Sequence, residues 1–399
     1  MKCRKDIENM KKAKEKERVY IINGARSYIG IENSMYRHIP VEKLGAAVLA
    51  KVAACCPQEA IDLIMAGNAV GAGGNPARLT ALEAGLPQWI PAITLDAQCS
   101  SGLESIAAAA AKISSGQADL IVAGGMESSS TAPRRGYHEN HPDYQAAGGA
   151  HAWYRAAKFS PGAHLESAML DGAERTAAAH EITRTQLDPW VLRSHQLAVK
   201  TREAGILEDI LIEVKEGCNF DEGIRDRMSQ RLLDRVPCVV QNGSVTTAAN
   251  ACLTNDGAAF LSLCSESYLR KHDRKPWAEF LDAVSVGGDP QKSPEAMIPA
   301  IRKLLMRNGL DETDIDIFEC NEAFAVIDEL FADAYPGAVE RYNVLGGALA
   351  YGHPYGATGG ILVLHALKAL EQNAGQLAVC GIAAAGGMGT AVLLRRCAS

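Results

Sequence analysis

The sequence lacks several patterns that would assign it to a common class of protein. It has 11 cysteines but no C-x-x-C pair, and no group of cysteine and histidine residues has zinc-site spacing. An odd number of unpaired cysteines indicates a reduced, cytoplasmic protein, and we expect no bound metal. No apolar run reaches the roughly 18 residues of a membrane span, so we expect no membrane partner. The net charge of −7 argues against nucleic acid as the main partner.

The N-terminal segment is also unlike a targeting sequence. Residues 1–18 are dense in lysine, arginine and glutamate and lack the apolar stretch of a signal peptide. We expect a charged N-terminal extension there, either a solvated helix or a frayed segment. The remaining part of the 399-residue chain is long enough to bury two cores.

Strand-like and helix-like patterns alternate after this extension, which favours an α/β fold. A first strand is expected at Val19–Ile22, ending at Asn23-Gly24, and a helix is expected at Val41–Ala54. The other predicted strands are Leu63–Gly67, Ile93–Leu95, Asp119–Gly125 and Leu377–Ile382, and helices are predicted at Leu103–Ile113 and from His353 to about Leu370.

Two regions of the chain follow the same plan. Cys99 and His353 each stand in a polar loop followed by a predicted helix, a predicted strand and a Gly-Gly-Met sequence. Such a weak internal duplication predicts two similar halves that pack face to face and bring the two loops to one cleft. Residues 131–244 are richer in charged and aromatic residues, and we expect an inserted loop domain over the active face.

These patterns divide the chain into four parts. The expected parts are the extension at 1–18, an N-terminal half made of 19–130 and 245–272, the insert at 131–244, and a C-terminal half at 273–399.

Cys99 is a candidate nucleophile. It lies between a predicted strand and a predicted helix, and small residues follow it. A helix N-terminus stabilises a thiolate through its dipole and free N–H groups, which can also hold a developing oxyanion. The structural alternative is an ordinary core cysteine in an apolar chain.

His353 and Asn321 are candidate partners of this cysteine. His353 is bracketed by glycine and proline in a constrained turn, from which it could take the proton of Cys99 or simply cap the next helix. Asn321 follows the apolar segment Ile315–Phe318. Its amide could donate to an oxyanion or a water, or the residue could be a helix N-cap.

The sequence resembles the thiolase family from about Val19 to Leu394. Five motifs carry the resemblance: A-R-T-P-I-G at Ala25–Gly30, C-x-S-G-L at Cys99–Leu103, A-G-G-M-E at Ala123–Glu127, N-E-A-F at Asn321–Phe324, and G-H-P-x-G-A at Gly352–Ala357. The last four occur separately and in the family's order, which makes chance similarity a poor explanation.

The resemblance implies roles for six residues. Cys99 would take the acyl group from coenzyme A or a 3-ketoacyl-CoA, His353 would activate it and help form an oxyanion hole, and Asn321 would position a catalytic water. Three further residues would contact the coenzyme: Arg225 in the D-E-x-x-R stretch, Cys252 where a serine is usual in T-A-G-N-A-S-G, and Met169 on the pantetheine side.

One position departs from the family pattern. Thiolases carry a second cysteine, in C-x-G-G-G, as acid and base, and counting back from Gly386 places Ala383 there. Cys380 lies three residues earlier, where a strand faces the opposite side about 10 Å away, so it would replace that cysteine only across a bulge. The candidates left open for this role are His353, Cys320, Cys380 and a water held by Asn321.

The fold and activity implied by the resemblance are specific. The fold would be two similar α-β-α-β-α layered halves with mixed five-stranded sheets and buried central helices, and the protein would be a homodimer or homotetramer. The activity would be Claisen-type acyl transfer through a thioester on Cys99, with coenzyme A and acyl-CoA as substrates and no permanently bound cofactor. The alternatives are acyl transfer or condensation without thiolysis, as in ketoacyl synthases, and a catalytically weak thiolase-fold subunit that serves as a partner.

Overall fold

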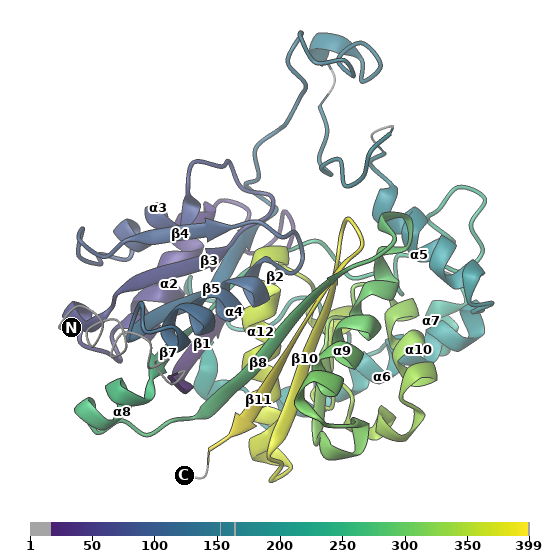
Figure 1. Cartoon of the computed structure of the whole chain (residues 1–399). Helices are drawn as coiled ribbons and strands as arrows, with labels where there is room; N and C mark the ends of the chain where they lie inside the picture. The colour runs from purple at the N-terminus through teal and green to yellow at the C-terminus, as the bar shows by residue number, and fades with distance from the viewer. Residues whose placement is uncertain (1–16, 152, 163–164, 398–399) are drawn as a thin grey trace, which may run out of the picture.

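One mixed β-sheet runs through the whole molecule (Figure 1). The computed structural model describes residues 17–151, 153–162 and 165–397, so nearly all of the expected N-terminal extension lies outside the described residues. The strands of the main path are β1 (Val19–Ser27), β3 (Leu63–Gly67), β4 (Ala92–Leu95), β5 (Leu120–Ser128), β7 (Asn255–Ser265), β8 (Ala278–Gly287), β9 (Ile317–Cys320), β10 (Leu377–Ala384) and β11 (Met388–Arg396). Their order is β4-β3-β5-β7-β1-β8-β11-β10-β9. Two short strands, β2 (Gly30–Ile31) and β6 (Leu211–Ile212), pair with β7 and β1.

The strand order confirms the internal duplication. In the N-terminal half, β4, β3 and β5 are parallel, and β7 and β1 follow in antiparallel pairing. In the C-terminal half, β9 and β10 are parallel, and β11 and β8 follow in antiparallel pairing. An isolated parallel bridge from Phe318 to Tyr342 takes the place of the fifth strand. This half therefore has four strands on the path, where five were expected.

The two halves share the sheet instead of carrying separate ones. β1 and β8 pair antiparallel, with Val19 opposite Phe280 and Ile21 opposite Ala278. The backbone hydrogen bonds of this pairing join the halves at the middle of the molecule. The prediction of an α/β fold with mixed sheets is confirmed, and the joining of the sheets is the feature that the sequence did not indicate.

The first strand is longer than predicted. β1 continues through Asn23-Gly24 to Ser27, whereas the sequence indicated an end at that dipeptide. The register with β7 shifts between Ile21 and Asn23. A bulge of this kind absorbs a turn-forming residue while the strand continues beyond it.

Helices pack against both faces of the sheet, and some of them lie in the interior of the molecule. They are α2 (Val41–Ala53), α3 (Pro76–Glu83), α4 (Ser101–Ser114), α5 (Ala168–Ala179), α6 (Arg184–Glu203), α7 (Gln230–Leu233), α8 (Glu266–His272), α9 (Met297–Asn308), α10 (Ala325–Ala334), α11 (Ala348–Tyr351) and α12 (Tyr355–Gln372). Within the described part of the chain, none of them combines the length and the apolar character that crossing a bilayer requires.

The central helices α4 and α12 occupy equivalent places in the two halves and pack against each other. Their first turns meet through glycine. A Cβ on Gly102 would lie 2.5 Å from the carbonyl oxygen of Gly356, and a Cβ on Gly359 would lie 2.0 Å from the backbone nitrogen of Leu103. Only residues without a side chain allow this approach. The loops that precede these two helices are thereby brought together.

The region between β5 and β7 combines the helices α5 and α6 with several shorter elements. Its first part, through the 3₁₀ turn at Gly149–His151, extends away from the sheet as the teal loop at the top of Figure 1. α6 packs against α10 and α11 of the C-terminal half. The segment is fastened to β1 by Asp221, whose carboxylate accepts two hydrogen bonds of 2.9 Å from the guanidinium of Arg26.

Candidate active site

Cys99 stands in a tight turn between β4 and α4. Gln98, before it, has a φ of 53°, in the left-handed region that few residues other than glycine adopt. The Asp96 carboxylate accepts the backbone N–H of Gln98 at 2.9 Å, and the Ser101 hydroxyl accepts that of Ala97 at 2.9 Å. α4 begins at Ser101, so Cys99 precedes the first residue of the helix by two positions. These bonds hold the cysteine in front of the helix.

The Cys99 thiol is protonated at neutral pH in the free protein. The residue is 8% exposed, and burial raises the pKa of its thiol to about 12. The backbone N–H of Ala385 donates to the sulfur and opposes this rise, whereas the charge of Glu127 adds to it. The expectation of a thiolate stabilised by the helix start therefore does not hold here, because desolvation outweighs the N–H groups. Such a thiol needs a base to become a nucleophile.

His353 has the protonation state of a base. It is 1% exposed, and burial lowers the pKa of its imidazole to about 3, so the ring is neutral. Nδ1 lies 2.6 Å from the Thr358 hydroxyl, which donates its own hydrogen to the carbonyl oxygen of Pro354 at 3.0 Å. Because a hydroxyl has one hydrogen, it must accept from an Nδ1–H, which leaves the Nε2 lone pair as the basic site.

Asn321 lies beside this basic nitrogen. Its Nδ2 is 3.3 Å from Nε2 of His353, and its backbone N–H donates to the carbonyl oxygen of Gly381 at 2.9 Å. The amide oxygen Oδ1 is buried and accepts no hydrogen bond from any group in the described ranges. α10 begins at Ala325 with Phe324 as its N-cap, so the alternative of Asn321 as a helix N-cap is wrong.

Glu322 holds the loop that carries Asn321. Its carboxylate accepts hydrogen bonds from the Ser194 hydroxyl at 2.6 Å, the Asn343 amide at 2.9 Å and the Leu349 backbone at 3.2 Å. One buried carboxylate thus joins α6, the segment before α11, and α11 itself.

Glu127 is a functional-site residue that the sequence reasoning did not single out. It is the last residue but one of β5, and its carboxylate accepts backbone N–H groups of Ala69 and Gly356 at 2.9 Å each and the Asn68 side chain at 2.7 Å. Burial raises the pKa of this carboxyl to about 7. The available signal for Glu127 in the sequence was its place at the end of the A-G-G-M-E motif. The motif alone does not show that the Glu127 carboxylate holds the first turn of α12.

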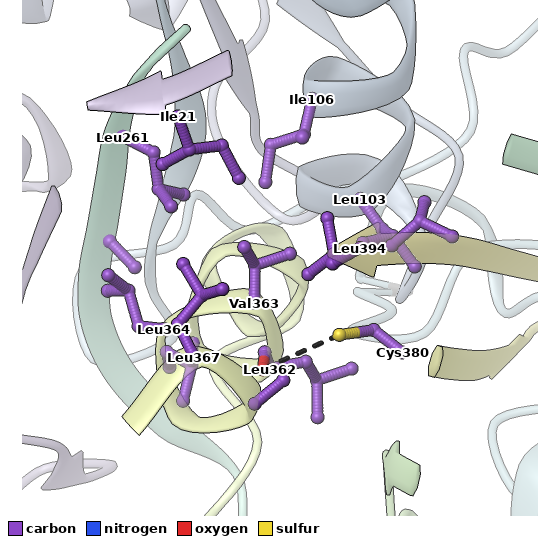
Figure 2. Packing of buried hydrophobic residues seen from close by; sticks show 14 of the residues in the cluster. Ile21, Leu103, Ile106, Leu261, Leu362, Val363, Leu364, Leu367, Cys380 and Leu394 are labelled. Carbon is purple, nitrogen blue, oxygen red and sulfur yellow. Dashed lines mark hydrogen bonds between the residues drawn. The ribbon is translucent and has the colours of Figure 1, made fainter. Parts of the chain in front are cut away.

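The structure defines the surroundings of the missing second cysteine. Ala383 is buried near the end of β10, and the backbone N–H of Ala385, two residues on, bonds to Cys99. The register of β10 with β11 is continuous from Leu377 to Ala384, so no bulge turns Cys380 toward this position. Figure 2 shows the Cys380 sulfur directed into the apolar core, 3.6 Å from the carbonyl oxygen of Leu362.

Cys320 is also placed poorly for proton transfer. It is fully buried at the end of β9, and it belongs to an apolar cluster with Phe318 and Val379. Burial raises the pKa of its thiol far above the usual range. Of the four candidates that the sequence left open, His353 is the side chain with a hydrogen bond to Asn321.

Comparison with known proteins agrees with this arrangement. A sequence model described as "Thiolase, N-terminal domain" matches residues 19–267, and one described as "Thiolase, C-terminal domain" matches residues 274–396. The chain belongs to the thiolase family. It is an acyltransferase of the thiolase type, and the predicted family is confirmed.

Individual relatives cover this thiolase nearly from end to end. YhfS of Bacillus subtilis (strain 168), provisionally named an acetyl-CoA C-acetyltransferase, is 34% identical over 94% of this chain and 98% of its own length. VraB of Staphylococcus aureus (strain MW2), with the same provisional name, is 35% identical over the same shares.

Two solved structures share the fold. The acetyl-CoA acetyltransferase of Bacillus anthracis has a TM-score of 0.88 at 28% identity and covers 96% of this chain and 100% of its own. Human mitochondrial 3-ketoacyl-CoA thiolase has a TM-score of 0.84 at 26% identity and covers 96% and 99%.

The D-E-x-x-R stretch of this thiolase divides into structural and solvent-facing residues. Asp221 binds Arg26, and the Glu222 carboxylate accepts the backbone N–H of Ile31 at 2.8 Å. The acidic pair therefore serves to fasten the segment. Arg225 donates from its guanidinium to the carbonyl oxygen of Glu222 at 2.7 Å and lines a cavity of about 420 Å³.

The three expected coenzyme contacts do not share one cavity. The cavity at Arg225 is also lined by Arg227, Met228 and Leu232. Met169 lines a separate cavity of about 130 Å³. Cys252 is half-buried. Burial raises the pKa of its thiol, and a negative charge on Cys99 raises that pKa further, so the two residues lie within electrostatic reach of each other. In residues 17–151, 153–162 and 165–397, no group of three or more His, Cys, Asp and Glu side chains could hold a metal ion.

Proposed function

We propose that this thiolase transfers acyl groups between Cys99 and coenzyme A, and that it makes or cleaves a 3-ketoacyl-CoA. The observation that carries the proposal is the neutral His353, whose basic Nε2 accepts a hydrogen bond from the Asn321 amide at 3.3 Å while Nδ1 is bonded to Thr358. Cys99 and His353 each precede one of the two helices whose first turns touch, and a base of this kind can activate a protonated thiol that meets it in one site. The names of the relatives favour acetyl-CoA and acetoacetyl-CoA as the first substrates to test.

The acylation step balances with these groups. The Cys99 proton passes to Nε2 of His353, the sulfur attacks the thioester carbonyl, and the carbon–sulfur bond to coenzyme A breaks. The departing thiolate takes the proton from His353. The products are an acyl thioester on Cys99 and coenzyme A with a free thiol. The Asn321 amide and nearby backbone N–H groups would stabilise the oxyanion that develops.

The coenzyme would lie against the insert at 131–244. Arg225 and Arg227 bring two permanent positive charges to one cavity, and Met228 and Leu232 add apolar surface. Guanidinium groups suit phosphate oxygens, and apolar walls suit an adenine ring. Coenzyme A would then be a substrate and not a resident cofactor. Within this arrangement the N-terminal half (19–130 and 245–272) would supply Cys99, and the C-terminal half (273–399) would supply Asn321 and His353.

The test is acylation measured by intact mass. After mixing with acetyl-CoA, the protein should gain one acetyl group, and Cys99→Ala should gain none. Cys55→Ala, which removes an exposed cysteine, is the matched control and should acetylate like the wild type. Acetylation of Cys99→Ala would show that another residue is the nucleophile. Acetylation without thiolysis of acetoacetyl-CoA would favour the ketoacyl-synthase-like alternative.

We also propose a homodimer or homotetramer in the cytoplasm. β4 is the terminal strand of the sheet, and Ile93 on it is 41% exposed. Leu79 and Leu82 of the adjacent α3 are also exposed, as is Trp89 between the two elements. An apolar edge strand next to an apolar patch invites pairing with a second copy. Light scattering should give two or four chains per particle, and Ile93→Lys should lower that number.

A further inference from the structure

Cys252 is a second thiol close to the two loops that carry the proposed catalytic groups. Its backbone N–H donates to the carbonyl oxygen of Ala323 at 2.9 Å, and the backbone N–H of Ala325 donates to the carbonyl oxygen of Asn250 at 2.8 Å. The segment that carries Cys252 therefore runs along the loop after Asn321. Two residues further, Thr254 forms a parallel bridge with His353.

Two side chains of this segment lie near Tyr355. The Thr254 side chain hydrogen-bonds to the Tyr355 phenol, and the charge of Cys252 acts on the same phenol, so both side chains lie near Tyr355. The Tyr355 ring packs edge-on against His353, with ring centres 5.0 Å apart. Cys252 therefore belongs to the surroundings of His353 and not to the cavity at Arg225.

The electrostatics agree with this placement. Burial raises the pKa of Cys252, and the charge of a Cys99 thiolate raises it further. Burial also raises the pKa of Tyr355, to which charges on Cys252 and on Cys99 both contribute. Groups affect one another in this way only when they share a region of low dielectric. Both thiols are protonated at neutral pH, and Cys252 is half-buried.

Cleavage of a 3-ketoacyl-CoA needs a group that the motifs do not supply. The leaving enolate must gain a proton at its α-carbon, and the incoming coenzyme A thiol must lose one. Ala383 has no proton to exchange, and the Cys380 sulfur faces the core. In His353, Nδ1 is bonded to Thr358 and Nε2 lies beside Asn321, where the proposed function requires it for Cys99.

We infer that Cys252 is the acid and base at the α-carbon and at the coenzyme A thiol. In thiolysis, Cys99 attacks the ketone and the bond between the α-carbon and the β-carbon breaks. Cys252 gives its proton to the α-carbon of the leaving acetyl-CoA and becomes a thiolate. Coenzyme A then passes its thiol proton to Cys252 and attacks the acyl thioester, and Cys99 leaves as a thiolate that recovers from His353 the proton it gave up when it attacked the ketone. Each proton is accounted for, and Cys252 ends protonated. This inference rests on the proposed role of Cys99.

An unpaired acceptor lies on the adjoining loop. Oδ1 of Asn321 is buried and has no hydrogen-bond partner in the described part of the chain, and Asn321 is two residues before Ala323, which pairs with Cys252. A substrate thiol, or a water, bonded there would lie against the loop whose Ala323 pairs with Cys252. A protein group left unpaired in a buried site costs free energy unless a ligand satisfies it.

The test compares two reactions in the same variant. Acetylation of Cys99 by acetyl-CoA needs no proton at an α-carbon, whereas thiolysis of acetoacetyl-CoA does. Cys252→Ser should acetylate within about twofold of the wild-type rate and lose about 10²-fold or more in kcat for thiolysis, with KM changed little. Cys238→Ser, which alters another half-buried cysteine of the described chain, is the control and should change neither.

A second variant tests the chemistry by moving the thiol. In the Cys252→Ser background, Ala383→Cys should restore thiolysis by at least about tenfold while acetylation stays constant. Full thiolysis in Cys252→Ser, or a loss that follows Tyr355→Phe instead, would overturn the inference. An equal loss of acetylation and thiolysis in both Cys252→Ser and Cys252→Ala would also overturn it, because it would mean a structural role. Failure of the wild type to acetylate at Cys99 would instead overturn the proposed function.

Discussion

Asp221 binds the two terminal guanidinium nitrogens of Arg26 at 2.9 Å, in an ion pair that is almost closed to solvent. The same carboxylate accepts the backbone N–H of Ile29 at 2.8 Å, and Nε of Arg26 donates to His365 at 3.1 Å. This one pair therefore connects the inserted segment, the first strand and the central helix α12.

Removing one member of this pair should destabilise the protein strongly. Asp221→Ala leaves the Arg26 charge buried without its partner, which typically costs about 3–5 kcal/mol of unfolding free energy. Urea unfolding measures the loss. Asp209→Ala removes the exposed partner of Lys368 and should cost within about 1 kcal/mol. Equal effects of the two variants would contradict the structural role of Asp221.

The hydroxyl of Thr358 should matter for acetylation, although it is remote from the sulfur in the proposed step. Thr358→Val removes the acceptor of Nδ1–H and leaves the His353 tautomer unspecified, so acetylation of Cys99 should slow by about tenfold or more. Thr358→Ser keeps the hydroxyl and should retain most of the rate. Rapid-quench mass measurement distinguishes the two. For comparison, His353→Ala should slow acetylation by about 10²-fold or more.

Arg225 should affect binding more than turnover. A phosphate contact far from the reacting bond stabilises substrate and transition state equally, so Arg225→Ala should raise KM for the acyl-CoA with little change in kcat. Steady-state thiolysis at several coenzyme concentrations gives both values. Arg231→Ala removes an exposed arginine of the neighbouring helix α7 and serves as the control. An unchanged KM in Arg225→Ala would remove this residue from the coenzyme site.

Glu127 should make stability depend on pH. Burial raises the pKa of its carboxyl from an ordinary value near 4.5 to about 7, so the folded state holds this proton more tightly than the unfolded chain. Stability therefore falls as pH rises from about 4.5 to 7, by about 3 kcal/mol in all, and then levels off.

Urea unfolding at pH 5 and pH 8 tests this dependence. Glu127→Gln should lose less stability between the two values than the wild type does, whatever its overall stability. Glu59→Gln changes an exposed carboxyl and should follow the wild type. Parallel curves for wild type and Glu127→Gln would show that another group controls the dependence.

Predictions from the sequence were most accurate for elements whose structure is determined by residues close together in the chain. The α4 and α12 helices, the strands β4, β5 and β10, and the loops with Cys99 and His353 all follow from apolar runs and turn residues close in the chain. The resemblance to thiolases supplied the order of the halves. Neither source indicated that β1 and β8 pair, because strand pairing between distant segments depends on register and packing that no local pattern contains.

Electrostatic properties were the least predictable. Cys99 precedes a helix, which favours a thiolate, but its burial in the folded protein raises the pKa instead. Cys252 stood out in the sequence only as a replaced serine. Its position next to His353 arises because residue 254 pairs with residue 353, a contact across nearly a hundred residues. The ion pair of Asp221 and Arg26 likewise joins residues far apart in the chain, which no local sequence pattern predicts.

The pairing of β1 with β8 has a consequence for how substrates enter. A hinge motion between the halves would break the backbone bonds between these strands and separate the touching turns of α4 and α12. The distance between the cysteine of one half and the histidine of the other is therefore set when the chain folds and stays constant through turnover. Discrimination among acyl groups then depends on the shape of this fixed site and not on closure around the correct substrate.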